Sequence, residues 1–440
     1  MRVRGSSPCH RIYSDGMRRE LQMGMENFKE RKFTKIEQDI IDNINKEVKE
    51  FNVLSDGTRE QKREVMKKRR VVNLKEKKSF LQNTYRKHFK KFYDIGKVDF
   101  GNLEPELILC TNQDQKDMWT FFRMTQSSLV WSGYYGRSMT YLLRDKNSGC
   151  VMGVLGLGSD FMAFKSRDDY IGWTRKDKFG KTVHADTGKE YTGKSVGSWK
   201  KQKELGLKKV DNRINNLMNI FVCVGVEPFN RLLVGKLLAM IAYSRQVMSD
   251  FEKKYNQPLV GITTTSIYGK SIQYDRIGNY MKYLGLSKGI GTAQFSVELV
   301  EKIRKYYDGD FKVNNRKDWM DTGHLGLQPK AKMIQMIAKH LGLKSSILRH
   351  GHRRGIYFGY TCRNSQLFLQ GKIKELSLKP IENRSSDDII NFWKERWMTK
   401  RIPSRVNKIE ENRYEFIEDY KSLMSLIRNG DSQKTLWDLK

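Results

Sequence analysis

The sequence predicts a mixed α/β protein, and three stretches carry that prediction. Residues 219–226 form an apolar run rich in β-branched and aromatic side chains, as expected of a buried strand. Residues 234–251 place their apolar side chains largely on one face, as expected of a helix that packs on a sheet. Pro258 restarts the chain into a second strand over residues 259–265. This strand–helix–strand order is typical of enzyme scaffolds and predicts a folded core rather than a basic tail.

A hairpin is expected before this unit and two further elements after it. Residues 139–145 and 150–157 predict the two strands of a hairpin, joined by Lys146-Asn-Ser-Gly149, which has the chemistry of a turn. Residues 277–285 form a second amphipathic segment, which we expect to be helical. Residues 354–360 predict one more strand. The expected core is therefore a sheet with flanking helices.

Composition divides the chain into three consecutive segments. Residues 1–97 are polar and helical in pattern, and we expect a basic N-terminal arm in which residues 35–51 carry an apolar stripe that includes Ile40, Ile44 and Val48. Residues 98–295 carry the α/β core, and residues 296–440 are mainly helical in pattern with one strand and a basic tail. Within the core, residues 174–211 are rich in Lys and Gly and hold few candidates for burial. We expect that segment to be a mobile excursion, of the kind that can cover a substrate.

The charge of the chain predicts a polyanionic partner. Its 440 residues include 83 Lys and Arg against 50 Asp and Glu, a formal net charge of +33. The excess recurs along the chain, and nucleic acid is the commonest polyanion, so we expect DNA, double- or single-stranded. A surplus that serves solubility, or an acidic protein partner, would give the same composition.

Cysteine spacing and hydropathy indicate in which cellular environment the protein is expected. The five cysteines are scattered with no paired spacing, which argues against a disulfide framework or a zinc knuckle and favours a reducing compartment. The sequence shows no membrane-length apolar run and no signal-peptide pattern, so we expect an intracellular protein without a membrane partner.

Basic side chains recur in three places that could contact phosphates. Residues 65–92 interleave Lys and Arg with aromatic residues, and this stretch could lie along DNA or be a solvated helix that covers the core. Residues 349–354 and the tail near residue 400 are also basic. The expected DNA-contacting residues are Lys68, Arg69, Arg70, Lys87, Lys90, Lys270, Arg349, Arg353, Arg354, Lys400 and Arg401.

Polar side chains that could carry chemistry gather at predicted strand exits. Tyr268 and Tyr274 follow the second strand, and ligands usually bind at the carboxyl end of such strands. Both rings could stack on a base, and Tyr134, between glycines, would suit the same pocket. His350 could act as a general acid or base. Phosphate contact suits its arginine-rich segment better than a metal, because the spacing suggests no third ligand.

Acidic residues offer a second type of chemistry. Asp160, Asp168 and Asp169 lie close to a predicted core strand, and paired carboxylates there could hold Mg²⁺ for strand cleavage. Alternatively, Arg167 and Asp168 could form an internal ion pair that anchors the loop.

The start of the helix at residue 234 is a candidate cofactor site. Backbone N–H groups at a helix N-terminus can hold a pyrophosphate or a DNA phosphate, and Arg231, Gly235 and Lys236 lie there. Only one glycine is present, so neither a dinucleotide fingerprint nor a Walker motif occurs. An ordinary helix start would have the same sequence.

Several motifs, in this order, resemble the DruA family. They are Arg167-Asp-Asp-Tyr-Ile-Gly-Trp173, residues 264–274, Tyr283-Leu-Gly-Leu-Ser-Lys-Gly289, His350-Gly-His-Arg-Arg-Gly-Ile-Tyr357 and Trp393-Lys-Glu-Arg-Trp397. The family takes its name from a component of the Druantia anti-phage system and has members in phages and mobile elements. The resemblance, over about residues 125–401, implies a place in the cytoplasm of a bacterial host, or association with a virion, and phage or defence-system proteins as partners.

The central unit is also similar to the acyltransferase fold of the GNAT superfamily, which the phage DNA-modifying protein Mom shares. In that fold a strand leads into a helix that binds the pyrophosphate of acyl-CoA, and a later helix carries a tyrosine before a Leu-Gly pair, as in Tyr283-Leu-Gly285. This similarity implies a GNAT-like central sheet and modification of a DNA base. Arg231-Leu-Leu-Val-Gly-Lys236 lacks the two glycines of the GNAT pyrophosphate loop, which argues against acyl-CoA and leaves the donor unknown.

Three functions therefore stay open. The first is a base-modifying enzyme that uses Tyr134, Tyr268, Tyr274 and His350 around a flipped or single-stranded nucleotide. The second is metal-dependent strand cleavage or transposition, with Asp168 and Mg²⁺. The third is a DNA-binding or virion-associated protein without catalysis. Dependence on a divalent metal separates the first two.

Overall fold

The computed structural model describes residues 32–411, except 59, 63, 67–73, 75–76, 90–91, 128–135, 193–198, 288–290, 293–294, 308–333, 335, 344–348 and 351–352. The chain forms two compact units, one of residues 1–56 with 290–352 and one of residues 57–289 with 353–440. This grouping differs from the three consecutive segments expected from composition. Within the described residues, no helix is both long and apolar enough to cross a membrane.

The smaller unit is built around two helices that are distant in sequence. Helix α2 (Lys35–Asp56) buries Ile40, Ile44 and Val48 against α13 (Val297–Tyr306). The apolar stripe seen in the sequence is thus the core of this unit, and it explains why an N-terminal helix groups with residues after 290. A short pair of strands, β10 (Gly291–Thr292) and β11 (Arg349–His350), also belongs to it.

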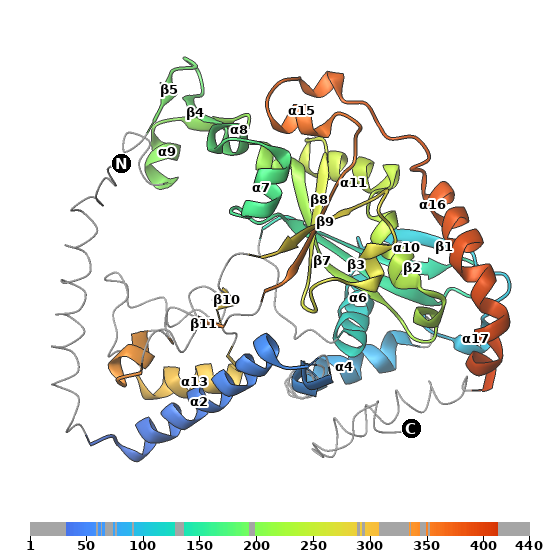
Figure 1. The fold of residues 1–440 in the computed structure, drawn as a ribbon, viewed down its shortest axis with the longest axis horizontal. Coiled ribbons are helices and arrows are strands. Elements are labelled where there is room, and N and C mark those ends of the chain that lie inside the picture. The colour runs from blue at the N-terminus through green and yellow to red at the C-terminus, as the bar shows by residue number, and fades with distance from the viewer. Residues whose placement is uncertain are drawn as a thin grey trace, which may run out of the picture. The chain divides into compact units, whose positions relative to one another are not determined.

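The larger unit contains a seven-stranded sheet (Figure 1). In spatial order its strands are β1 (Pro105–Leu109), β2 (Ser138–Asp145), β3 (Val151–Ser159), β7 (Leu217–Gly225), β8 (Gly261–Ser266), β12 (Gly355–Tyr360) and β9 (Lys282–Leu286). All neighbours are antiparallel except β7 and β8, which are parallel. The mixed α/β class, the hairpin and the two central strands expected from the sequence are confirmed.

Helices cover both faces of this sheet, and two glycines of β3 allow them to approach closely. A Cβ at Gly156 would lie 2.9 Å from Trp119 of α6 (Gln113–Gln126), and a Cβ at Gly153 would lie 2.7 Å from Leu238 of α10 (Val234–Ile241). Residues three apart on a strand point to opposite faces. Helices α6 and α10 therefore pack on opposite faces of the same strand.

Two expected helices differ in the structure. The helix expected over 234–251 is two helices: α10 ends at Ile241, and Ser244 caps the start of α11 (Arg245–Tyr255) by accepting a hydrogen bond from the backbone N–H of Val247. Residues 277–285 were expected to be helical, and this is wrong, since residues from Lys282 onward form the edge strand β9 beside β12. Gly278 and Gly285 weaken a helix there, and pairing with a strand 70 residues later, which no local pattern reveals, decides the outcome.

The segment 174–211 contains regular structure where a mobile excursion was expected. Helix α7 (Lys165–Ile171) leads to α8 (Arg175–Phe179), followed by a small antiparallel sheet of β5 (Glu190–Tyr191), β4 (Lys181–His184) and β6 (Leu207–Val210) in that order. Helix α9 (Trp199–Glu204) precedes β6. We call residues 175–211 the lysine-rich module. Its elements lie away from the large sheet (Figure 1).

Short helices and a C-terminal helical run complete the larger unit. Helix α16 (Ser386–Trp393) continues through the π-helix η8 (Lys394–Met398) into α17 (Thr399–Glu411). Trp393 and Trp397 are both buried. The remaining short elements are α4 (Lys78–Thr84), η1 (Tyr85–Phe89), η2 (Ile95–Lys97), η4 (Arg213–Asn216), η5 (Phe229–Leu232), α12 (Ile272–Asp275), α15 (Ser365–Leu369) and η7 (Glu375–Ser377).

Candidate functional site

Four charged side chains form a buried network beyond the end of β3. Arg167 of α7 is fully buried, and its Nη1 lies 2.7 Å from Oδ2 of Asp160. Its Nη2 lies 2.6 Å from Oδ1 of Asp168, and Lys178 of α8 pairs with the other oxygen of Asp168. Of the two sequence-based alternatives for Arg167 and Asp168, the structure contains the internal ion pair.

Every carboxylate oxygen of this network already has a donor. Oδ1 of Asp160 accepts a hydrogen bond from the backbone N–H of Phe161, and Oδ2 accepts one from the Thr263 hydroxyl on β8. Burial raises the pKa of the Asp160 carboxyl, and the Arg167 guanidinium opposes that rise. Although burial of Asp168 acts in the opposite direction, Arg167 and Lys178 together lower the pKa of its carboxyl.

This network leaves no vacant ligand for a magnesium ion at Asp168. No cluster of three or more potential metal-ligating side chains occurs among the described residues. Millimolar Mg²⁺ should therefore leave the midpoint of thermal unfolding unchanged within about 1 °C, for the wild type and for Asp168→Asn alike. Differential scanning fluorimetry measures this. A Mg²⁺-dependent rise in the wild type that Asp168→Asn abolishes would contradict the prediction.

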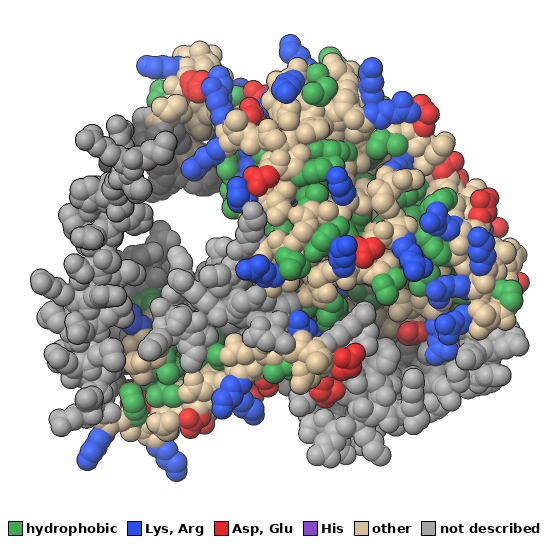
Figure 2. Space-filling view, viewed as in Figure 1, with side chains coloured by type: hydrophobic (Ala, Val, Ile, Leu, Met, Phe, Trp, Pro, Cys, Tyr) green, Lys and Arg blue, Asp and Glu red, His purple; other side chains and the backbone are tan. Residues whose placement is uncertain are grey.

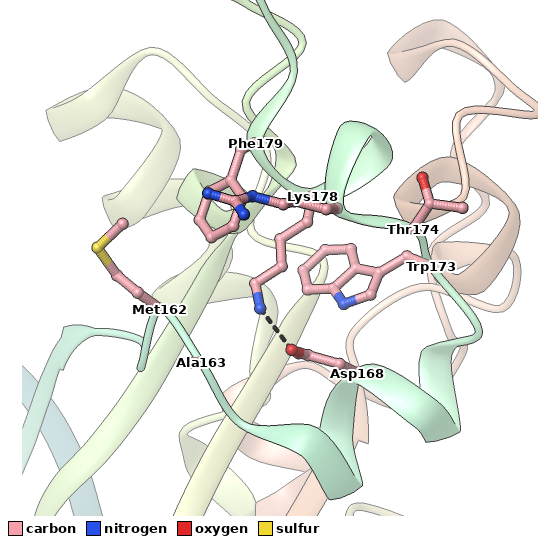
Figure 3. Close-up of a pocket in the computed structure, with 8 residues that line it drawn as sticks. Met162, Ala163, Asp168, Trp173, Thr174, Lys178 and Phe179 are labelled. Carbon is pink, nitrogen blue, oxygen red and sulfur yellow. Dashed lines mark hydrogen bonds and ion pairs between the residues drawn. The ribbon is translucent and has the colours of Figure 1, made fainter. Parts of the chain in front are cut away.

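Two residues of this network, Asp168 and Lys178, line a pocket of about 430 Å³ (Figure 3). Its lining residues are Met162, Ala163, Asp168, Trp173, Thr174, Arg175, Lys178 and Phe179. The Lys178 ammonium lies 5.8 Å from the centre of the Trp173 ring and 5.0 Å from that of Phe179. The Arg167 guanidinium lies 5.6 Å from the Trp173 ring. These cations hold the two rings in place from within the fold.

The predicted cofactor site at the start of α10 is filled by the chain itself. Strands β7 and β8 pair only as far as Ile220 and Thr264, and α12 packs where they separate. The Gln273 amide donates to the carbonyls of Cys223 and Gly235, both at 3.1 Å. A Cβ at Gly235 would lie 3.3 Å from the Gln273 side chain, so Gly235 faces protein rather than an open cradle.

Lys236 is turned into the same region as a buried ammonium. The side chain, 2% exposed, donates to the carbonyl of Ile272 and, at 3.4 Å, to that of Gln273. Its Nζ lies 5.7 Å from the Trp397 ring. Burial, and then the positive charge of Arg276, lower the pKa of Lys236 to about 8. In this conformation the Lys236 ammonium of α10 is hydrogen-bonded to backbone carbonyls of α12, so it is not available to bind a cofactor.

Tyr274 and Lys270 lie in one aromatic cluster beside these groups. Tyr274 is 8% exposed, with its ring 5.1 Å from that of Tyr357, and Tyr283 lies 5.2 Å from Tyr357. The Lys270 ammonium lies 5.4 Å from the Tyr283 ring. Burial raises the pKa of Tyr274 well above its usual value, so its phenol keeps its proton. Tyr268 lies half-buried in the turn after β8.

Four arginines gather on η8, on α17 and just after the end of α12. Arg276, Arg396 and Arg405 are exposed, and Arg401 is half-buried. Arg401 donates to the backbone carbonyl of Arg231 at 3.3 Å, so residues expected to bind DNA and a cofactor meet here. Partial burial, and then the charges of Arg405 and Arg276, lower the pKa of Arg401. We call Arg276, Arg396, Arg401 and Arg405 the arginine patch.

The arginines of this patch form no ion pair in the part of the chain that the structure describes. Arg396 instead lies 5.2 Å from the Trp397 ring. In Figure 2, basic side chains gather between α10 and α17. Lys400 is exposed in the same helix, α17.

The other predicted site residues fall into two groups. Lys87 and Arg353 are exposed, and Arg354 is half-buried, with a pKa lowered by burial. The remaining ones lie outside the described residues, or have side chains outside them, and their roles stay predictions. They are Lys68, Arg69, Arg70, Lys90, Tyr134, and the side chains of Arg349 and His350.

Sequence reasoning missed the residues that build the pocket. Lys178 and Phe179 fall in the segment that was expected to be mobile. One signal was available, because Thr174 and Asp177 have the spacing of a capping box, and the structure contains that box at the start of α8. A helix starting there places Lys178 one turn away from Trp173. Arg276 and Arg396 gave no local signal, since their neighbourhood depends on how α12 and η8 pack.

Together these features define a class of protein: a mixed α/β protein with an ion-paired aromatic pocket and an unneutralised arginine patch. The chain belongs to the DruA family, whose model, described as Druantia protein DruA, matches residues 56–186 and 196–371, more than half of the chain. It is similar to the Druantia protein DruA of Escherichia coli, with 25% identity over 310 residues. That match covers 65% of this chain and 66% of the E. coli protein. No solved structure matches the chain.

Proposed function

We propose that this protein binds DNA through the arginine patch, as a component of a Druantia-type anti-phage defence system. The observation that carries the proposal is the cluster of four arginines, none of them ion-paired among the described residues, in which burial and then the charges of Arg405 and Arg276 lower the pKa of Arg401. Such repulsion costs free energy in the isolated protein, and an anion with closely spaced charges relieves it. The phosphate backbone of DNA is such an anion, and arginine is well suited to phosphate oxygens.

Two further features support the proposal. The net charge of +33 attracts DNA from a distance and speeds association. The E. coli relative is named as a Druantia protein, and a defence system against phages acts where foreign DNA enters the cell. The family membership thus supports a role in anti-phage defence, and the arginine patch supports direct contact with DNA.

Replacing Arg276 and Arg405 by Ala should weaken duplex DNA binding about tenfold near 0.1 M salt. It should also reduce the slope of log affinity against log salt by about two, because two phosphate contacts are lost. Both side chains are exposed, so folding should be unaffected. Fluorescence anisotropy with a labelled duplex at four salt concentrations measures both quantities.

The matched control is Arg363→Ala. Arg363 is also exposed, but its guanidinium lies 2.8 Å from Glu382, so it adds little net charge to the surface. This variant should bind like the wild type with an unchanged salt slope. If the double variant in the arginine patch also binds like the wild type, DNA does not contact this patch.

Base modification is the second candidate function. The observation in its favour is the parallel pair β7–β8, connected through α10 and α11, because the resemblance to the GNAT fold implies a strand that leads into a helix. Three observations favour DNA binding without that chemistry. Gln273 fills the space where β7 and β8 separate, and Tyr274 is buried. Tyr283 lies on the strand β9 rather than on a helix. Mass spectrometry of nucleosides from a plasmid co-expressed with the protein decides between them, because a new nucleoside mass would establish modification.

A further inference from the structure

The pocket beside Trp173 has an exposed apolar rim. Met162 is 64% exposed and Phe161 is 38% exposed, and the Phe161 ring lies 5.1 Å from that of Phe164. Large apolar side chains left exposed beside a hollow indicate an interaction site. Ala163 is also exposed, and both Met162 and Ala163 line the pocket.

The pocket is pre-organised for a flat, electron-rich ligand. Trp173 and Phe179 form aromatic walls, and the ion pairs of Arg167 and Lys178 with Asp168 keep these walls rigid. Its volume of about 430 Å³ lies within the range of small-molecule sites and has room for one nucleobase with its sugar. Arg175 is exposed in the lining, where a phosphate attached to that sugar would lie.

The lysine-rich module extends this site with further cations. Lys208 and Lys209 are neighbours on β6, so their side chains point to opposite faces of the small sheet, and both are exposed. Their cross-strand partners on β4 are Val183 and Thr182, which carry no charge. Lys176, also exposed, follows Arg175 on α8. Arg175 and Lys176 therefore lie at the pocket lining or next to it along the chain, and the module carries further positive charge on both faces of its sheet.

We propose that the pocket and the lysine-rich module bind single-stranded DNA, with one unpaired base against Trp173, Phe179 and Met162. The flanking phosphates contact Arg175 and the lysines of the module. Aromatic side chains together with a basic surface are the usual means by which proteins bind single strands. A duplex keeps its bases stacked inside and cannot fill the pocket. This inference rests on the proposed DNA binding and specifies a second, strand-selective site.

The test uses the full chain and a variant that fills the pocket. Ala163→Trp places a large ring in the hollow from an exposed position, so the fold is preserved. Leu376→Trp, at a residue 99% exposed, is the matched control. A single-stranded oligonucleotide with one 2-aminopurine, and the duplex of the same sequence, are titrated with each protein.

We expect Ala163→Trp to weaken single-strand binding about tenfold, the usual effect of losing one stacked base, while duplex affinity stays within about twofold. Leu376→Trp should bind both like the wild type. Unchanged single-strand affinity in Ala163→Trp, or an equal loss for both DNA forms, would overturn the pocket proposal while duplex binding by the arginine patch stands. A wild type that binds neither form would overturn both proposals.

Discussion

Replacing Arg167 by Met should lower the free energy of unfolding by about 3–5 kcal/mol, the largest single-residue effect we expect. Arg167 is fully buried and lies 2.7 Å from Asp160, which is buried as well. Without the guanidinium, the Asp160 carboxylate would be an unpaired charge in the interior. Methionine fills a similar volume, so most of the loss comes from charge rather than from a cavity. Chemical denaturation at neutral pH measures it.

A surface ion pair provides the control for this prediction. Arg144 lies 2.6 Å from Glu106, at nearly the same distance, but its side chain is 37% exposed. Arg144→Met should therefore cost no more than about 1 kcal/mol. Because burial raises the pKa of Asp160, the deficit of Arg167→Met should shrink as the pH falls and the carboxyl gains a proton. A deficit below 1 kcal/mol at neutral pH would contradict the prediction.

The stability of the wild type relative to Lys236→Met should rise by about 3 kcal/mol between pH 8 and pH 10.5. Burial lowers the pKa of Lys236 to about 8 in the folded protein, against an ordinary value of 10.5. Within this window the unfolded chain holds more protons on Lys236 than the folded chain does, so stability increases with pH. Below pH 8 both forms are protonated and the full cost of the buried ammonium is present.

Urea denaturation of the wild type and the variant at several pH values from 7.5 to 10.5 measures this difference. Other lysines, tyrosines and cysteines titrate in both proteins, so their contribution cancels when the two are subtracted. Lys146→Met removes an exposed lysine and controls for the loss of one positive charge. A difference between the wild type and Lys236→Met that is independent of pH would show that Lys236 is not held as a buried ammonium.

Much of the large sheet could be predicted from local pattern. The apolar runs of β3 and β7, the turn residues between β2 and β3, and the restart of the chain at Pro258 before β8 are local patterns that can be recognised within about ten residues. The apolar stripe of α2 could be recognised because it too is a local pattern, and Ile40, Ile44 and Val48 are buried as expected. The helix predicted for residues 277–285 was wrong because the edge strand that forms there depends on its partner β12, which lies far along the chain.

The candidate site was less predictable than the fold. The ion pair of Arg167 with Asp168 joins adjacent residues, so it was one of the two alternatives that the sequence offered. Its other members, Asp160 and Lys178, come from different elements, and only the folded chain shows that all four carboxylate oxygens have donors. Lys236 was interpreted as an anion-binding residue, because nothing local indicates that α12 packs over it.

The amino-acid sequence by itself determined the α/β class, the family and the strong positive charge of this protein. These properties depend on composition, on periodicity over a few residues and on short motifs in a constant order. Only the tertiary structure decided which charges are neutralised and which are left to attract a partner. Whether a charge is neutralised depends on a distance of a few ångströms to an opposite charge, such as the 2.7 Å between Arg167 and Asp160. Those distances follow from packing between elements that are distant in sequence.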